Sequence, residues 1–287
     1  MAKNLVAALL FAATAASPAL AGTTLPNLPP GPLGAAIQRG HDMMMSSASP
    51  EVKPYIGNAL ACSSCHLNAG DTAAPGNFRF TATKLPAFSP REGVVITLED
   101  RIANCFMRSM NGMRPGTDSP VIVDMAAYIT WLDRTKPIYG PLPAAPKSPF
   151  PAMLKTASAD TVKAGATVYS TNCAACHGAT GQGVPGSFPP LWGPNSYNAG
   201  AGLANIAKLA TWVKGNMPLG NPHLTPTQAF DVALYIDSHA RPDFTLSQHL
   251  PAGMPPGDYN AAVREEHDTT ASDLKKAGLT LPVIASP

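Results

Sequence analysis

The chain has 287 residues, a length that suggests about two domains. Its 20 lysines and arginines nearly balance its 18 aspartates and glutamates. This balance argues against a nucleic-acid partner, because binding a phosphate backbone requires a clear excess of basic residues.

The first 21 residues have the pattern of a secretory signal. Lys3 gives a basic start, residues 5–16 are apolar, and Ala19 and Ala21 form an A-x-A cleavage site before Gly22. The apolar run is too short to span a bilayer, and we find no later candidate in the sequence. We therefore expect cleavage after Ala21 and export to the periplasm, with no membrane span in the mature chain.

Four of the five cysteines lie in two copies of a C-x-x-C-H motif. The motif residues are Cys62, Cys65 and His66 in the first copy and Cys173, Cys176 and His177 in the second. This spacing is typical of covalent attachment of a c-type haem, in which two thiols form thioethers and the adjacent histidine binds iron. Disulfides or a zinc site fit poorly, because the copies are far apart and each has its own histidine. We therefore expect two covalently bound haem c groups.

Helical periodicity surrounds each motif. We expect helices over residues 33–45, from 97 to an end at Asn111 and Gly112, and over 119–132, then over 161–171, 204–213 and 225–238, with a loop over 70–90. A helix, a haem motif, a ligand loop and a last helix form the plan of class I cytochrome c, and the plan occurs twice. The predicted fold is all-α, with two class I cytochrome c domains in tandem.

Residues 137–151 hold six prolines, which disrupt helix and sheet interiors, and we expect this stretch to be the connector between the domains. The expected organisation is a signal peptide over 1–21, a first domain over 22–136, the Pro-rich linker over 137–151, a second domain over 152–240 and an extended tail over 241–287. We expect the tail to pack as a strap over one or both domains.

The remaining cysteine, Cys105, lies on the helix that we expect to begin at Thr97. Arg101 precedes Cys105 by four positions, and Arg108 and Ser109 follow it by three and four. Side chains at these spacings are neighbours on a helix. The helix therefore predicts a thiol among basic and polar groups. Solvated surface and pairing with haem propionates are the alternative roles for the arginines.

Each haem iron also needs a ligand on its far side. Met217 lies 40 residues after His177, in a loop before the last helix, where class I cytochrome c places its axial methionine. Lys214 and His223 are the competing ligands nearby. We expect His177/Met217 ligation in the second half.

The spacing of residues along the sequence does not decide which residue is the corresponding ligand in the first half. Cys105 lies 39 residues after His66, close to the spacing in the second half. Counting back from the last helix favours Met110, and the sequence around Met113 is more like the loop around Met217. Cys105, Met110 and Met113 all stay open, with a buried structural thiol as the alternative role for Cys105.

The segment LEDRIANCFMRSMNG, residues 98–112, resembles the signature of the dihaem thiosulfate dehydrogenases. Further similar segments are residues 55–58 and 62–70 in the first half, and 190–193 and 200–202 in the second. The resemblance runs from about residue 33 to about residue 244. It is much more specific than C-x-x-C-H, which occurs in every c-type cytochrome.

The resemblance implies that the first haem is ligated by His66 and the thiolate of Cys105 and is the site of chemistry. The basic and polar positions that match around this site are Arg91, Arg101, Arg108 and Ser109. The second haem then passes the electrons on. Some members have a lysine beside the axial methionine that exchanges with it; Asn216 stands here, which puts that exchange in doubt.

The implied reaction joins two thiosulfate ions into tetrathionate and delivers two electrons to an external acceptor, such as a small periplasmic cytochrome c. A thiolate ligand lowers a haem potential and His/Met ligation raises it, so electrons should flow from the first haem to the second. The alternatives are a dihaem carrier with His/Met ligation through Met110 or Met113, a sulfur-oxidation (Sox) cytochrome with a carrier-protein partner, and a tetrathionate reductase.

Overall fold

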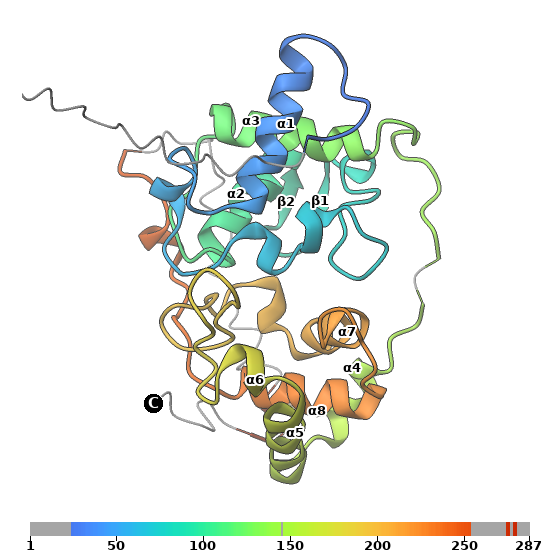
Figure 1. The fold of residues 1–287 in the computed structure, drawn as a ribbon, viewed down its shortest axis with the longest axis vertical. Helices are drawn as coiled ribbons and strands as arrows, with labels where there is room; N and C mark the ends of the chain where they lie inside the picture. Colours follow the sequence, from blue (N-terminus) through green and yellow to red (C-terminus); the bar gives the residue numbers. More distant parts are fainter. Residues whose placement is uncertain (1–23, 145, 254–273, 276–277, 280–287) are drawn as a thin grey trace, which may run out of the picture.

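The computed structural model describes residues 24–144, 146–253, 274–275 and 278–279. The expected signal segment and its cleavage site lie outside these residues, as does most of the expected tail. In the described part the helices form two groups, one from each half of the chain, stacked one above the other in Figure 1. No described helix combines the length and hydropathy needed to cross a membrane.

The first half is built on α1 (Pro32–Met45), α2 (Leu98–Arg108) and α3 (Pro120–Leu132). The Thr97 side chain accepts from the Asp100 backbone N–H, and the Asp100 carboxylate accepts from the Thr97 backbone N–H in return, so these two residues form a capping box at the start of α2. Four 3₁₀ turns lie between α1 and α2: η1 (Lys53–Tyr55), η2 (Cys62–Ser64), η3 (Leu67–Gly70) and η4 (Ala82–Lys84).

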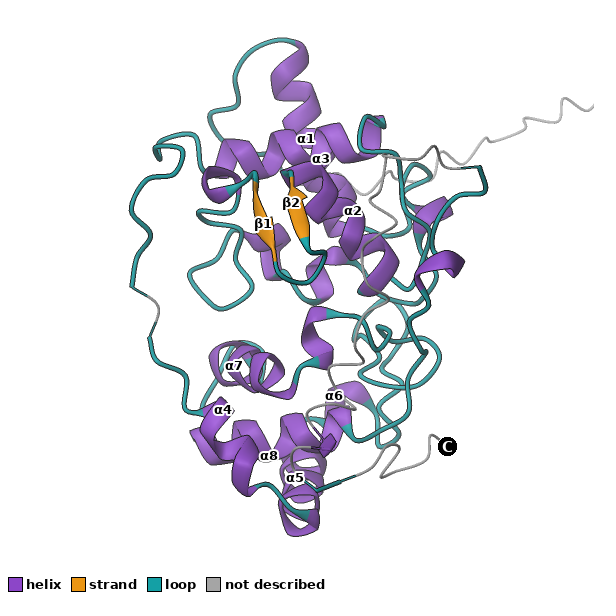
Figure 2. Ribbon diagram, turned by 180° about the vertical axis from the view of Figure 1, so that it is seen from behind, coloured by secondary structure: helices purple, strands orange, loops and turns teal. Residues whose placement is uncertain are grey.

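A short hairpin precedes α2, partly inside the stretch expected to be loop. Strand β1 (Ala87–Ser89) pairs antiparallel with β2 (Val94–Ile96). Valine and isoleucine favour strands, but three residues are too few to give a readable alternation of apolar and polar positions. The fold is otherwise helical, as predicted, and Figure 2 shows the hairpin beside the helices of the first half.

The second half repeats the plan with more helix at its start. Its elements are α4 (Phe150–Met153), η5 (Leu154–Thr156), α5 (Ala159–Asn172), α6 (Ala174–His177), η6 (Gly202–Ala204), α7 (Ile206–Asn216) and α8 (Pro226–Asp237). Thr225 and Gln228 form a capping box at α8. Helix α4 begins inside the stretch expected to be the connector, with a proline in its first turn, where the missing N–H costs nothing.

The same helix crossing is present in both halves. In α1, a Cβ at Gly40 would lie 2.0 Å from the carbonyl oxygen of Asp124 in α3. In α5, a Cβ at Gly165 would lie 2.0 Å from the carbonyl oxygen of Asp231 in α8. Only glycine lets two helix backbones approach this closely. In each half, the long helix before the haem motif therefore packs closely against the last long helix.

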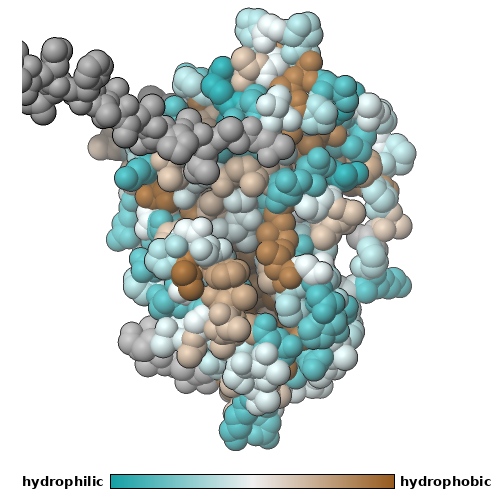
Figure 3. All heavy atoms as spheres, in the orientation of Figure 1, coloured by the Kyte–Doolittle hydropathy of each residue, from teal (hydrophilic) through white to brown (hydrophobic). Residues whose placement is uncertain are grey.

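The tail returns from α8 to the first half. The Ala199 N–H donates to the carbonyl of Pro242, and the Phe244 ring lies under the Arg108 guanidinium, 4.3 Å from ring centre to Cζ. A last 3₁₀ turn, η7 (Leu246–Gln248), leads to His249, whose Nδ1–H donates to the Gly112 carbonyl. Residues 241–249 thus join the two halves. In the space-filling view, apolar side chains are exposed at the surface where the two halves meet (Figure 3).

Candidate active site

The first C-x-x-C-H motif surrounds one end of a cavity of about 400 Å³ in the first half. The Nδ1–H of His66 donates to the Gly76 carbonyl oxygen at 2.6 Å, and the ring stacks on Phe78 with centroids 4.3 Å apart. Burial lowers the pKa of His66 to about 4, so the ring is neutral with Nε2 available as a lone-pair donor. Metal-binding histidines usually donate their other ring N–H to a carbonyl or carboxylate in this way, which fixes the orientation of the ring.

The cavity fits a haem attached to this motif. Cys62 and Cys65 line it together with His66, and burial raises the pKa of both thiols to about 12. The remaining walls are mainly apolar, with Met44, Leu60, Phe106, Met125 and Ile129 contributed by α1, α2, α3 and the segment before η2. Two neutral sulfurs, a neutral imidazole and apolar walls form a suitable environment for a covalently held porphyrin.

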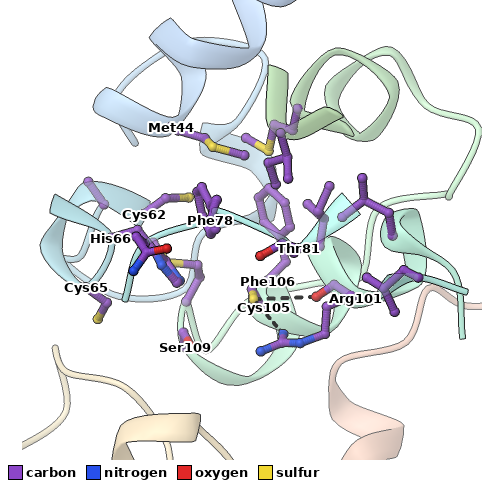
Figure 4. Close-up of a pocket in the computed structure, with 18 of the residues that line it drawn as sticks. Met44, Cys62, Cys65, His66, Phe78, Thr81, Arg101, Cys105, Phe106 and Ser109 are labelled. Atoms are coloured by element: carbon purple, nitrogen blue, oxygen red, sulfur yellow. Dashed lines mark hydrogen bonds between the residues drawn. The ribbon is translucent and has the colours of Figure 1, made fainter. Parts of the chain in front are cut away.

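Helix α2 brings Cys105 and Arg101 to the same cavity, as the helical spacing predicted. The Nη1 of Arg101 donates to the Cys105 sulfur at 3.0 Å (Figure 4). The negative charge of a Cys105 thiolate raises the pKa of Arg101. Ser109, one turn further on, also lines the cavity, and the Asn58 amide donates to its carbonyl oxygen. A sulfur, a fixed cation and a hydroxyl therefore share one wall.

The structure separates the three candidates for the far ligand of the first haem. Cys105 and Met110 both line the haem cavity, and Met110 is also part of the first hydrophobic core. Met113 instead lines a different cavity, between the Asn111–Gly112 turn and the tail near His249. The cavity thus brings two of the three sulfurs near the motif, and the ligand itself stays a prediction.

Arg108 and Arg91 are placed differently from Arg101. Arg108 is 2% exposed and faces away from the lining of the haem cavity, toward Glu92 at 3.6 Å and the Phe244 ring. Arg91, in the β1–β2 turn, is half-buried, and its Nη1 donates to the Gly200 carbonyl of the second half at 3.4 Å. Their expected place around the catalytic site therefore lacks the direct geometric support that Arg101 has.

Asp100 and Asn104 of α2 form a largely buried polar network with Glu92 and Arg114 that sequence reasoning missed. Glu92 accepts from the Asn104 amide at 3.2 Å, and Asn104 accepts from Arg114 at 3.1 Å. Arg114 also pairs with Asp100 at 2.6 Å. The network holds α2 against the hairpin and the turn that follows the helix. No local pattern relates Glu92 to Arg114, because each residue lies outside the helix.

Lys84 is a second cationic residue of the cavity wall that sequence reasoning missed. It closes η4 and lines the haem cavity together with Asn77 and Thr81. These residues lie in the expected loop, where no periodicity indicated which side chains point inward.

The second C-x-x-C-H motif spans all of α6 and the residue before it, Cys173. The Nδ1–H of His177 donates to the Pro189 carbonyl at 2.9 Å, which repeats the arrangement at His66, and burial lowers the His177 pKa. Burial likewise raises the pKa of Cys173 to about 11. Cys176, the other thiol of the motif, is exposed. The motif therefore offers the same two thiols and oriented imidazole as the first.

Met217 directly follows the last residue of α7 and packs partly buried against the second hydrophobic core. Of its competitors, His223 is exposed with Nδ1 directed to the Asn221 carbonyl, and Lys214 is half-buried in the last turn of α7. These positions leave Met217 as the candidate most closely associated with the core, and its ligation stays a prediction.

Comparison with known proteins agrees with this duplicated architecture. Residues 162–240 match the cytochrome c family model, and residues 54–138 match the SoxA/TsdA cytochrome c domain model. The chain is 38% identical over 227 residues to the thiosulfate dehydrogenase of Allochromatium vinosum, which covers 76% of this chain and 82% of that protein. It is 33% identical over 220 residues to that of Thiomonas intermedia, covering 75% and 69%.

A solved structure is similar as well. The as-isolated thiosulfate dehydrogenase of Marichromatium purpuratum aligns with a TM-score of 0.64 at 34% identity, covering 75% of this chain. This chain spans about half of that longer one, 48%. With two cytochrome c domains, two haem-attachment motifs and these relatives, the chain is a dihaem c-type cytochrome and an oxidoreductase that belongs to the thiosulfate dehydrogenase family.

Proposed function

We propose that this protein oxidises thiosulfate in the periplasm. Two thiosulfate dianions lose one electron each and join through a new S–S bond, giving tetrathionate and two electrons. The observation that carries the proposal is the pairing of Arg101 with Cys105 on the wall of the cavity that contains His66. The family relatives named thiosulfate dehydrogenase support the choice of substrate.

We propose His66 and Cys105 as iron ligands of the first haem, and His177 and Met217 as those of the second. The haems supply one-electron acceptors for the reaction and pass the electrons to an external carrier, such as a small periplasmic cytochrome c. Both histidines are oriented for this role by a carbonyl at Nδ1.

The electrostatics of the cavity suit two anionic substrates. Arg101 supplies a fixed positive charge beside the reacting sulfur, which offsets the repulsion between two dianions. The Ser109 hydroxyl is a hydrogen-bond donor that also lines the cavity, and the exposed Lys84 adds a positive charge to the lining. Arg91 bonds to the second half, and Arg108 contacts the hairpin and the tail. In these positions the two arginines stabilise the surroundings of the site.

Cys105 can also carry the substrate covalently. Its thiolate and the sulfane sulfur of one thiosulfate form an S–S bond with release of two electrons. The sulfane sulfur of the second thiosulfate then attacks the bound sulfane sulfur, and the Cys105 thiolate leaves as tetrathionate forms. Intact-mass analysis after mixing with thiosulfate should detect the adduct on Cys105, and clean turnover by a Cys105→Ala variant would exclude it.

The deciding experiment is thiosulfate-dependent reduction of ferricyanide by the wild type and by Cys105→Ala, both checked for two bound haems. We expect turnover by the wild type only. Met113→Leu, a sulfur removed outside the haem cavity, is the matched control and should keep its activity. If the wild type is inert while both haems remain redox-active, the protein is a carrier or acts on another sulfur compound.

A further inference from the structure

Two side chains of α7 reach from the second half to the loop of the first haem motif. The indole Nε1–H of Trp212 donates to the carbonyl oxygen of Cys65 at 2.8 Å. The amide of Asn216 donates through Nδ2 to the carbonyl oxygen of Pro75 at 3.0 Å. Both ribbon views show α7 on the side of the second half that faces the first (Figures 1 and 2). We call this pair of hydrogen bonds the α7 clamp.

Glycine on each side of the boundary allows the clamp to close. A Cβ at Gly76, where φ is +91°, would lie 2.8 Å from the Cys65 carbonyl oxygen and 3.0 Å from the Trp212 nitrogen. A Cβ at Gly215 in α7 would lie 2.4 Å from the Pro75 ring. The backbone of the first half therefore rests directly on the surface of α7.

On the side of the first half, the clamp holds both segments that position the first haem. Cys65 is one of its attachment cysteines. Pro75 precedes Gly76, whose carbonyl accepts from Nδ1 of His66 at 2.6 Å. The two carbonyls that the clamp holds are thus covalently adjacent to the groups that attach and orient this haem.

On the side of the second half, the clamp ends beside the proposed axial ligand. Asn216 is the last residue of α7, and its amide donates both to Pro75 and to the Trp212 carbonyl, at 2.9 Å. The next residue is Met217. The Asn216 side chain is therefore engaged in the domain contact, and a shift of α7 would move Met217 with it.

We propose that the α7 clamp sets the geometry of electron transfer between the two haems, with Trp212 and Asn216 as positioning residues. This inference rests on the dihaem arrangement of the proposed function. In this step one electron leaves the first haem and reduces the second, and no bond forms or breaks and no proton moves. Two hydrogen bonds and a glycine contact on both sides hold α7 in place against the loop of the first haem motif, and so would fix how two haems bound to these halves lie relative to each other.

Laser-flash photoreduction of the oxidised, full-length holoprotein with deazaflavin tests this step without thiosulfate. Trp212→Phe removes the N–H but keeps an aromatic ring. Gly215→Ala favours the helix but places a methyl group against Pro75. We expect each to slow transfer between the haems on the order of tenfold or more, since small losses of positioning have large effects on rate. Haem content and both midpoint potentials should match the wild type.

Matched controls make the same substitutions away from the clamp. Trp131→Phe changes a tryptophan that stacks with Arg134 in the first half, and Gly202→Ala adds a methyl group where no atom lies within 4 Å. Both should transfer at the wild-type rate. Unchanged rates in Trp212→Phe and Gly215→Ala would overturn the proposal, as would slower rates that appear only with shifted potentials.

The flash experiment and the ferricyanide assay together distinguish a failure of the clamp from a failure of the proposed function. If the wild type does not oxidise thiosulfate but the clamp variants slow flash-induced transfer, the clamp proposal stands and the proposed substrate is wrong. If the wild type oxidises thiosulfate but neither variant changes the flash-induced transfer rate, the proposed substrate stands and the clamp proposal is wrong.

Discussion

The guanidinium of Arg101 lies 3.0 Å from the sulfur of Cys105, one helical turn away on α2. Arg108 lies at a similar distance along the helix on the other side of Cys105, but it is buried against Glu92 and Phe244. Two arginines that are equivalent in the sequence pattern therefore have different surroundings, and the predictions below follow from that difference.

Arg101→Leu should reduce thiosulfate turnover about 10- to 100-fold, because a charge-assisted hydrogen bond contributes roughly 1.5–3 kcal/mol. The ferricyanide assay gives kcat and KM, and Arg101→Lys should recover part of the loss. Arg79→Leu is the control, since Arg79 is exposed and pairs with Asp71 on the surface. Full activity in Arg101→Leu would remove this residue from the mechanism.

The main effect of Arg108→Leu should be a loss of stability. Removing it leaves Glu92 buried beside an apolar side chain, which costs about 3–5 kcal/mol of unfolding free energy. Urea unfolding measures the loss, and a double variant that also carries Glu92→Leu should regain part of it. Lys163→Ala, which breaks an exposed pair with Asp160, should cost at most about 1 kcal/mol.

The same Arg108 variant also tests the substrate role expected from the family resemblance. If KM for thiosulfate rises while the unfolding midpoint stays at the wild-type value, Arg108 contacts the substrate and our placement of it in a supporting network is wrong.

Acidification should destabilise the contact between the tail and the first half. His249 is buried, and burial, with a smaller contribution from Arg108, lowers its pKa. Below about pH 6.5 the unfolded chain then binds a proton that the folded chain does not, so stability present above this pH is lost as the pH falls toward the lowered value. Thermal unfolding of His249→Gln between about pH 7 and about pH 5 should show a weaker pH dependence.

Gln at this position can still donate to the Gly112 carbonyl, so the comparison isolates the titration. His223→Gln, at an exposed histidine, is the control and should keep the wild-type pH dependence. An unchanged dependence in His249→Gln would assign the acid sensitivity to other groups, of which buried His239, with its lowered pKa, is the first to examine.

Gly40→Ala and Gly165→Ala should each destabilise one half of the molecule by about 1–3 kcal/mol or more, because the added methyl group meets a carbonyl oxygen of the facing helix. Calorimetry should show a lower transition temperature for the half that carries the substitution. Gly202→Ala should leave the transition temperatures of both halves unchanged. Wild-type stability in both helix variants would contradict the close crossing.

Much of this architecture was readable from local sequence. The C-x-x-C-H copies predict two covalent haems, and apolar periodicity predicts the helices that carry the sites, because these signals depend on neighbours within a few residues. The spacing of Arg101 and Cys105 predicted their contact for the same reason. The β1–β2 hairpin was missed because each strand is only three residues long.

The tertiary structure decided which chemically similar side chains face the cavity. Met113 turns away from the haem cavity and Met110 lines it, and Arg108 joins Glu92 while Arg101 meets Cys105. It also brought Trp212 to Cys65, although 147 positions separate them. Local sequence carries no signal for contacts of this range, because they depend on how two separately folded halves and the tail pack together.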